Sequence, residues 1–212
     1  MNKIAIFGAG GFGREVASLI KRINKENPKW DLLGFYDDNP STCDNEYGRY
    51  LGDMATLNTI DFPLSVVLAV GNPHALKKIK ERILNPLIAF PNIIAPEASI
   101  LDPDNYKIGQ GNILGSFVSL SCNVTLGDFN VINNRTSFGH DASVGDYNVF
   151  MTASRISGST QIGSENLFGV GSILLPGIKI GKNTIITPGS VVVRGTKDNN
   201  TYIGNPAKIF KF

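Results

Sequence analysis

The sequence predicts a small α/β domain followed by a long parallel β-helix. Two observations predict the β-helix: large apolar residues recur at every sixth position over residues 108–192, and in eight of these fifteen hexads the next residue is glycine. A third observation, apolar strands that alternate with amphipathic helices over the first ninety residues, predicts the α/β domain. We place the boundary near residue 91, which gives domains 1–90 and 91–212.

The six-residue pattern runs without interruption, with Ile, Leu, Val or Phe at all fifteen positions. The spacing does not follow the 3.6-residue period of a helix, so it indicates short strands joined by sharp corners. Three hexads make one coil of eighteen residues, and coils stack at the strand spacing of about 4.8 Å. The repeating apolar residues, called the ladder below, are Ile108, Leu114, Leu120, Leu126, Ile132, Phe138, Val144, Phe150, Ile156, Ile162, Phe168, Leu174, Ile180, Ile186 and Val192.

The corners of such a coil need residues that tolerate a left-handed backbone conformation. We expect the hexad glycines to supply it, together with asparagines, because other residues enter that conformation at a cost. The asparagines in question are Asn130, Asn148, Asn166 and Asn183.

Both ends of the repeat depart from the regular pattern. Ile100 and Ile108 are eight residues apart, so the segment between them holds a two-residue insertion, and a first irregular coil begins near Pro91. The last twenty residues leave the six-residue phase, as expected of a terminal cap that covers the final apolar layer.

The first ninety residues predict a small Rossmann-like domain with a parallel sheet. Apolar runs predict the strands, and an apolar face at helical spacing predicts the first helix. The strands are expected at 3–7, 31–38, 65–71 and around 87–94, and the helices at 14–24 and 72–84.

Composition excludes several classes of protein. The 20 basic and 18 acidic residues are scattered, without the basic run that tracks nucleic acid, so no nucleic-acid partner is expected. The two cysteines, Cys43 and Cys122, fit reduced thiols better than a disulfide framework. The apolar run at the N-terminus is too short for a signal peptide or a membrane span, and we expect a cytoplasmic protein.

A glycine-rich turn follows the first predicted strand. Gly8, Gly10 and Gly13 satisfy G-x-G-x-x-G between a strand and a helix, the context in which the motif binds phosphates. Backbone amides there approach a phosphate, and the helix N-terminus favours its negative charge. The domain has room for one mononucleotide half, so a single nucleotide fits better than a dinucleotide. The alternative is that the glycines only pack the helix against the sheet.

Other residues follow the predicted strands at the same edge of the sheet. Asp37 and Asp38 end the second strand, where an acidic pair can accept hydrogen bonds from a ribose or a base. Gly71 and Asn72 follow the third strand and are candidates for the same site. His74 begins the next helix, and we interpret it as a surface or capping residue.

His140 is the candidate for catalysis. It stands two residues after the ladder residue Phe138, where the side chain points out of the coil, and Asp141 follows it. An exposed imidazole can take a proton from an amine or a hydroxyl near neutral pH. The adjacent carboxylate is placed to fix its tautomer.

The eighteen-residue period then predicts the neighbours of His140. Gly158 follows it by one coil and should lie directly beneath it. A glycine there leaves room for a thioester, and its amide can donate to an oxyanion. Val170 and Pro188 are also one coil apart, on a different face, and are placed to line a groove for a long ligand.

Together these features resemble the hexapeptide-repeat nucleotide-sugar acetyltransferases of bacterial surface-glycan synthesis, which include sialic acid O-acetyltransferases. The resemblance rests on GAGGFGRE, a strand that ends in DD, hexads that carry a His-Asp pair, and a closing IGNPAK. It implies a left-handed β-helix, a homotrimer with active sites between neighbouring β-helices, acetyl-coenzyme A as co-substrate and a nucleotide sugar held by the N-terminal domain. It implies no metal.

The resemblance also implies roles for particular residues. His140 corresponds to the general base and Asp141 to its acidic neighbour. The residues that correspond to acetyl-coenzyme A contacts are Gly158, Val170 and Pro188. Those that correspond to nucleotide-sugar contacts are Gly11, Phe12, Gly13, Asp37, Asp38 and Gly71.

Two positions depart from the family pattern, and other functions stay open. Phe12 and Val149 stand where some relatives carry His. We favour a UDP-linked amino sugar, because an amine needs only a modest base; O-acetylation of sialic acid or a related sugar and non-catalytic sugar-nucleotide binding are the alternatives. A β-helical carbonic anhydrase needs three His ligands for zinc, and the chain has two His.

Overall fold

The computed structural model describes residues 1–210, and these divide into two compact units. The first unit is Met1–Pro96 and the second begins at Glu97; the sequence placed the boundary near residue 91. Lys211 and Phe212, the end of the predicted cap, lie outside the described residues. Within residues 1–210, no helix is long and apolar enough to cross a membrane.

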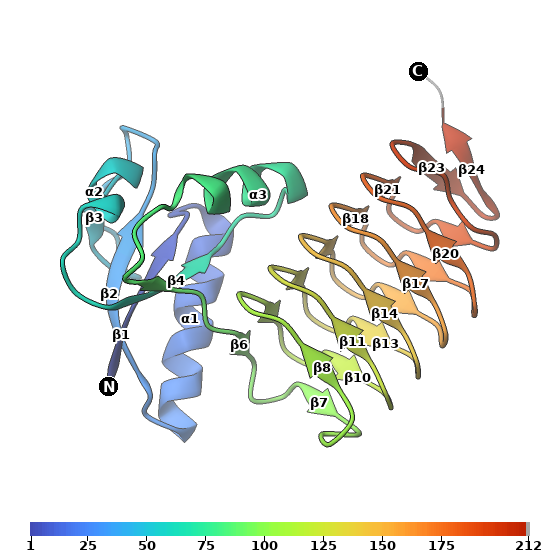
Figure 1. Cartoon of the computed structure of the whole chain (residues 1–212), viewed down its shortest axis with the longest axis horizontal. Coiled ribbons are helices and arrows are strands. Elements are labelled where there is room, and N and C mark those ends of the chain that lie inside the picture. Colours follow the sequence, from blue (N-terminus) through green and yellow to red (C-terminus); the bar gives the residue numbers. More distant parts are fainter. Residues whose placement is uncertain (211–212) are drawn as a thin grey trace. The chain divides into compact units, whose positions relative to one another are not determined.

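The first unit is a five-stranded parallel sheet with helices, as predicted. The strand order is β3-β2-β1-β4-β5, so the first strand lies at the centre (Figure 1). Helix α1 contacts β1 and β2, and α3 contacts β4. The elements are β1 (Asn2–Phe7), α1 (Gly11–Glu26), β2 (Trp30–Tyr36), β3 (Tyr50–Gly52), α2 (Met54–Asn58), β4 (Leu64–Leu68), α3 (Pro73–Arg82), β5 (Ile88–Ala89) and β6 (Ile93–Ile94).

The structure adds two elements that the sequence pattern did not indicate. Strand β3 is three residues long and pairs with the edge of β2, and α2 follows it for five residues. Both are too short to show a hydrophobic period. The single strand expected around 87–94 is divided into β5 and β6.

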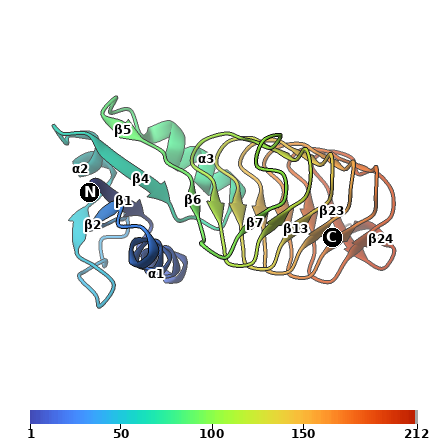
Figure 2. The same ribbon diagram turned by 90° about the horizontal axis from the view of Figure 1, so that it is seen from below.

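The second unit is a solenoid of two-residue strands on three faces, which Figures 1 and 2 show as a stack of coils. The first face holds β7 (Ser99–Ile100), β10 (Ser119–Leu120), β13 (Ser137–Phe138), β16 (Arg155–Ile156), β19 (Ile173–Leu174) and β22 (Val191–Val192). The second holds β8 (Lys107–Ile108), β11 (Thr125–Leu126), β14 (Ser143–Val144), β17 (Gln161–Ile162) and β20 (Lys179–Ile180). The third holds β6, β9 (Ile113–Leu114), β12 (Val131–Ile132), β15 (Val149–Phe150), β18 (Leu167–Phe168), β21 (Ile185–Ile186), β23 (Thr201–Gly204) and β24 (Ala207–Phe210).

Strand pairing confirms the eighteen-residue period and its two irregular ends. Leu120 pairs with Phe138, one coil on, and the same offset holds along all three faces. Ile100 pairs with Leu120 instead, twenty residues on, which confirms the two-residue insertion. At the other end β23 and β24 form an antiparallel hairpin. The predicted fold class, an α/β domain followed by a left-handed parallel β-helix, is therefore confirmed.

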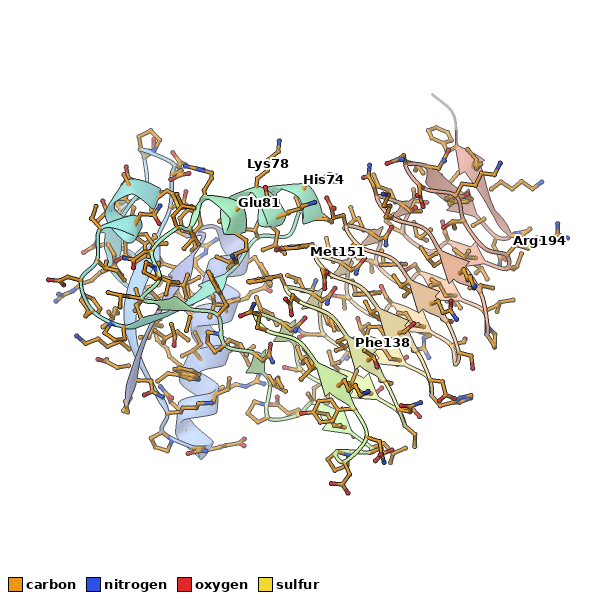
Figure 3. All side chains as sticks on the ribbon, viewed as in Figure 1. His74, Lys78, Glu81, Phe138, Met151 and Arg194 are labelled. Atoms are coloured by element: carbon orange, nitrogen blue, oxygen red, sulfur yellow. The ribbon has the colours of Figure 1, made fainter. Side chains whose placement is uncertain are left out.

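The ladder forms the interior of the solenoid. Fourteen of its fifteen residues are buried, and Ile108, in the first regular coil, is half-buried. Three phenylalanines pack together in the middle coils: the Phe150 and Phe168 rings stack at 4.4 Å, and Phe138 meets Phe150 edge to face at 5.0 Å. Figure 3 shows Phe138 in these middle coils. Phe138, two residues before His140, is therefore packed against the aromatic rings of the third face.

The expected source of the left-handed corners was wrong. Positive φ recurs every six residues from Gly111 to Gly189, three positions after the ladder residue, and mostly on residues other than glycine. The hexad glycines one position after the ladder residue, such as Gly109, are not among them. Their reason is close packing: a Cβ on Gly109 would overlap the Asp128 carboxylate of the next coil.

Three of the four asparagines assigned to corners also lie elsewhere. Asn130, Asn148 and Asn166 are fully buried and point inward, and only Asn183 has a positive φ. The side chains of the three bond in a column that begins with Asn112: the Asn130 side-chain amide donates to Asn112 at 3.1 Å, and Asn148 donates to Asn130 at 3.0 Å. The column satisfies buried polar groups without water, so its members specify register between coils.

Candidate active site

His140 and Asp141 form a hydrogen-bonded pair on an outer corner of the solenoid. The imidazole Nδ1 lies 2.8 Å from Asp141 Oδ2. The His140 side chain is 66% exposed, because Phe138, two residues earlier, points inward and turns the corner outward. Nδ1 is engaged by the carboxylate, so Nε2 is the ring nitrogen that can meet a reacting group.

The Asp141 carboxylate has a second partner. Its Oδ1 accepts a hydrogen bond from the side-chain amide of Asn123 at 2.8 Å. The pKa of Asp141 lies below its ordinary value, first because of the hydrogen bond with the His140 ring and then because of the bond from Asn123. Asp141 is therefore held in its ionised form, the form that orients an imidazole.

Hydrogen bonds to the coils above and below fix the backbone of this corner. The Asp141 amide donates to the carbonyl of Cys122 at 3.0 Å, and the Ser159 amide donates to the carbonyl of His140 at 2.7 Å. Cys122 thus lies one coil above His140. Neither Cys122 nor Asn123 was singled out from the sequence, although each precedes a member of the pair by eighteen residues.

Gly158 lies against the imidazole, as the period predicted. A Cβ built on Gly158 would be 2.7 Å from His140 Nε2 and 2.8 Å from Cε1. A Cβ on Gly139 would in turn overlap the Gly158 amide nitrogen, so two glycines meet beneath the ring. Within residues 1–210, the Gly158 amide donates to no protein acceptor. The imidazole therefore fills the space that a side chain at position 158 would take, so the gap expected there is closed, and the corner brings a base and a backbone donor side by side.

Val170 and Pro188 stack on another corner, between the third and the first face. The Gly189 amide donates to the Val170 carbonyl at 2.8 Å, which places the two corners in contact. Val170 is 51% exposed and Pro188 is exposed, so both side chains are accessible in the single chain.

In the α/β unit, the glycines near the sheet edge fall into two groups. Gly8 has φ +109° and lies against the Ala69 carbonyl, and a Cβ on Gly13 would overlap the Gly8 carbonyl. Gly13 is therefore required by close packing, and Gly8 by close packing and by its backbone conformation, without any ligand. At Gly71 a Cβ would meet nothing within 4 Å, and at Gly11 only the Arg14 guanidinium at 3.9 Å. Neither has a positive φ, so local structure does not explain these two glycines.

Asp37 and Asp38 are already engaged within the unit. Asp37 Oδ2 accepts from the Ala9 amide at 2.7 Å, so the carboxylate ties the glycine-rich turn to the end of β2. Asp38 accepts from the Met54 amide at 3.0 Å and forms an ion pair with Arg82 at 2.6 Å. Sequence spacing brought both residues to the correct edge of the sheet, but it did not show these bonds.

The other residues singled out from the sequence differ in their exposure. Phe12 is half-buried in the first turn of α1, and Val149 is fully buried on the third face. His74 is exposed in the first turn of α3, where Figure 3 shows it. Among the described residues, no three His, Cys, Asp or Glu side chains gather in a way that would hold a metal ion.

Comparisons with known proteins identify a family for the first unit. Residues 3–83 match the family described as the PglD N-terminal domain. No curated protein sequence matches the chain.

Several solved structures share the fold over the full length of the chain. The acetyltransferase domain of PglB from Neisseria gonorrhoeae, in complex with acetyl coenzyme A, is 26% identical, with a TM-score of 0.86, and the match covers 99% of this chain and 100% of that one. PerB from Caulobacter crescentus, in complex with CoA and GDP-perosamine, is 25% identical, with a TM-score of 0.87 and coverage of 100% and 98%. WeeI from Acinetobacter baumannii is 24% identical, with a TM-score of 0.87 and coverage of 99% and 100%.

The fold and the corner at His140 define a class of protein in which an α/β domain of the PglD type precedes a hexapeptide-repeat β-helix. The resemblance in the sequence pointed to the same class. The resemblance to the hexapeptide-repeat nucleotide-sugar acetyltransferases is thereby confirmed: residues 3–83 match the PglD N-terminal domain family, and the whole chain is similar to the acetyltransferase domain of PglB and to PerB.

Proposed function

We propose that the protein transfers an acetyl group from acetyl-coenzyme A to an amino group of a nucleotide-linked sugar. The observation that carries the proposal is the His140–Asp141 pair, whose Nε2 lies close to Gly158. The complexes of PglB with acetyl coenzyme A and of PerB with CoA and GDP-perosamine support both substrate classes.

The reaction is a direct transfer. The amine nitrogen of the sugar attacks the thioester carbonyl carbon, and a tetrahedral intermediate forms. His140 Nε2 takes a proton from the attacking nitrogen while Asp141 holds Nδ1–H. The intermediate collapses with cleavage of the carbon–sulfur bond, and the imidazolium returns the proton to the sulfur. Coenzyme A leaves as a thiol and the sugar carries an amide, with no metal and no covalent enzyme intermediate required.

The Gly158 amide is assigned to the oxyanion. It lies beside Nε2 and has no acceptor among the described residues, so it is available to a developing negative charge. A backbone donor fixed in this way stabilises the transition state without reorganisation. Val170 and Pro188 are assigned to the long arm of coenzyme A, as exposed apolar side chains on one corner.

The α/β unit is assigned to the nucleotide sugar. Gly11, Phe12, Gly13 and Gly71 lie with Asp37 and Asp38 at the carboxyl edge of a parallel sheet, where such folds bind ligands. The open space at Gly11 and Gly71 supports contact with a ligand at those two positions. Gly13 contributes by packing, and Asp37 by holding the turn. We favour a UDP carrier and a homotrimer with active sites between subunits.

Replacing His140 tests the proposal. His140→Ala should lower kcat by about 10²- to 10⁴-fold, the usual contribution of a general base. Thiol release from acetyl-coenzyme A reports turnover, with a panel of UDP- and GDP-linked 4-amino sugars as acceptors. His74→Ala is the matched control because His74 is the other histidine of the chain, and it should retain the wild-type rate. Near-normal turnover by a folded His140→Ala variant would contradict the assignment.

The acceptor panel separates the alternatives. The same panel should include hydroxyl acceptors such as sialic acid. An amide product detected by mass spectrometry supports N-acetylation. An ester product would instead mean that the protein is an O-acetyltransferase. Binding of a nucleotide sugar without thiol release from any acceptor would mean a binding protein and not an enzyme.

A further inference from the structure

Asn123 extends the His140–Asp141 pair into a chain of three side chains. It lies on the coil above Asp141, eighteen residues earlier, and its Nδ2 lies 2.8 Å from Asp141 Oδ1. The other carboxylate oxygen, Oδ2, is the one that meets the His140 ring at 2.8 Å. Each oxygen of one carboxylate therefore has its own partner, and the two bonds together fix its rotation.

The exposure of the pair gives this second bond its importance. The Asp141 side chain is 52% exposed, so water competes for both of its oxygens. If the imidazole were the only partner of the Asp141 carboxylate, the two side chains could rotate together away from this geometry. Asn123 ties the opposite oxygen to a rigid coil, whose backbone also accepts from the Asp141 amide through Cys122 at 3.0 Å.

Backbone conformation does not by itself explain an asparagine at this position. Asn123 has φ 57°, and asparagine tolerates the left-handed region. The same position of other hexads holds Phe117, Arg135 and Glu165, with φ between 59° and 63°, so the corner does not require asparagine. What Asn123 adds is the side-chain amide.

We propose that Asn123 is a positioning residue: it holds the Asp141 carboxylate in the rotation that keeps His140 Nδ1 engaged and Nε2 over Gly158. This role rests on the proposed function of His140 as the base. Asn123 touches no reacting atom and acts through Asp141.

Two substitutions at Asn123 test the role. Asn123→Gly removes the amide and tolerates the backbone conformation, and Asn123→Asp keeps the size but replaces both N–H donors with an acceptor that repels Asp141. We expect Asn123→Gly to lower kcat about tenfold, as loss of a hydrogen bond to a charged group does, with both KM values within about twofold of wild type. Asn123→Asp should lower kcat further.

The control substitution is Asn183→Gly. Asn183 occupies the same hexad position with φ 52° and donates to Asn199 at 2.7 Å, on a corner that does not carry His140. It should retain the wild-type kcat. An equal loss of kcat in Asn183→Gly would mean a general structural effect and would overturn the proposal.

Nitrogen NMR of the two histidines supplies a readout that needs no acceptor. In the wild type, the ring shifts of His140 should report the tautomer protonated at Nδ1, and in Asn123→Gly they should move toward a mixture of both tautomers. Unchanged ring shifts with wild-type kcat in Asn123→Gly would overturn the proposal. His140→Ala is measured alongside. If His140→Ala retains activity, His140 is not the base and the proposed function fails. If His140→Ala is inactive while Asn123→Gly has the wild-type kcat, only the role of Asn123 is refuted.

Discussion

The two units of the chain differ in how far the contacts of a residue can be predicted from its position in the sequence. In the solenoid one contact recurs at every coil, so the position of Gly158 under His140 follows from counting eighteen residues. In the α/β unit each contact occurs once: Gly13 packs against Gly8, whereas Gly71 faces open space. The same residue type therefore has a predictable role in the repeat and an individual one in the sheet.

This difference decides which substitutions are informative. A repeat is stabilised by contacts between neighbouring coils, so a damaged layer affects the coils on both sides of it. A small sheet depends on a few close approaches, which only coordinates reveal. The predictions below test the contrast, beginning with the largest expected effect.

The aromatic layer of the solenoid should be the most sensitive point. Phe150 is fully buried between the Phe138 and Phe168 rings. Phe150→Ala should lower the free energy of unfolding by about 3–5 kcal/mol, as large-to-small core changes do. Chemical denaturation measures the loss. Phe150→Leu is the control and should cost less than about 1.5 kcal/mol. A similar cost for both variants would show that the loss comes from the stacked rings, which both variants lack, and not from the buried volume, which leucine largely keeps.

The close contact between Gly158 and the His140 ring should be sensitive in activity and not in stability. Gly158→Ala places a methyl group 2.7 Å from Nε2 and must displace the ring. We expect kcat to fall about a hundredfold, the effect of a misplacement of about 1 Å. Cys122→Ala, at the same corner one coil above, should keep the wild-type rate. Steady-state kinetics of the two folded variants measure both rates. Equal rates would contradict the inference that the His140 ring packs against Gly158 and not against Cys122.

The glycine-rich edge of the sheet should divide into two kinds of position. Gly13→Ala forces a Cβ into the Gly8 carbonyl and should cost about 2 kcal/mol of stability, typical of overpacking. Gly71→Ala meets open space, so it should unfold within about 0.5 kcal/mol of wild type. Under the proposed function, Gly71→Ala should instead raise KM for the nucleotide sugar. An unchanged KM would remove Gly71 from the acceptor site.

The smallest effect is a pH dependence in the α/β unit. Asp53 caps α2, and the hydrogen bond from the Thr56 amide is the first cause that lowers its pKa below the ordinary 3.8. A carboxyl with a lowered folded-state pKa stabilises above its unfolded value, and the contribution is lost as pH falls through the folded value. Thermal unfolding from pH 7 to pH 3 should show the difference between wild type and Asp53→Asn shrinking toward pH 3. If the difference in thermal stability between wild type and Asp53→Asn stayed constant with pH, the charge of Asp53 would be excluded as its source.

Sequence periodicity predicted most of the solenoid and part of its site. The ladder gave the interior, the two-residue insertion and the position of Gly158, because each depends on register alone. The same eighteen-residue spacing could have predicted the contact between Asn123 and Asp141. The left-handed positions were assigned wrongly except at Asn183, because the six-residue apolar period does not show which of the other residues of a hexad turns the corner.

The α/β unit was predicted only to the level of the sheet. Spacing brought Asp37 and Gly71 to one edge, because parallel strands end together. It could not show that Asp37 holds the Ala9 amide, or that α2 follows β3, because these contacts depend on how a single loop folds back.

The eighteen-residue coil also sets the unit in which this chain can change length during evolution. An insertion of one whole coil at a corner keeps every later residue on its face and only lengthens the stack. An insertion of six residues between His140 and Gly158 would move Gly158, Val170 and Pro188 each to the next face and separate the base from the glycine that it packs against. Related chains that keep this site should therefore differ in length by whole coils downstream of His140, while smaller differences collect in segments such as residues 101–107 that precede the regular repeat.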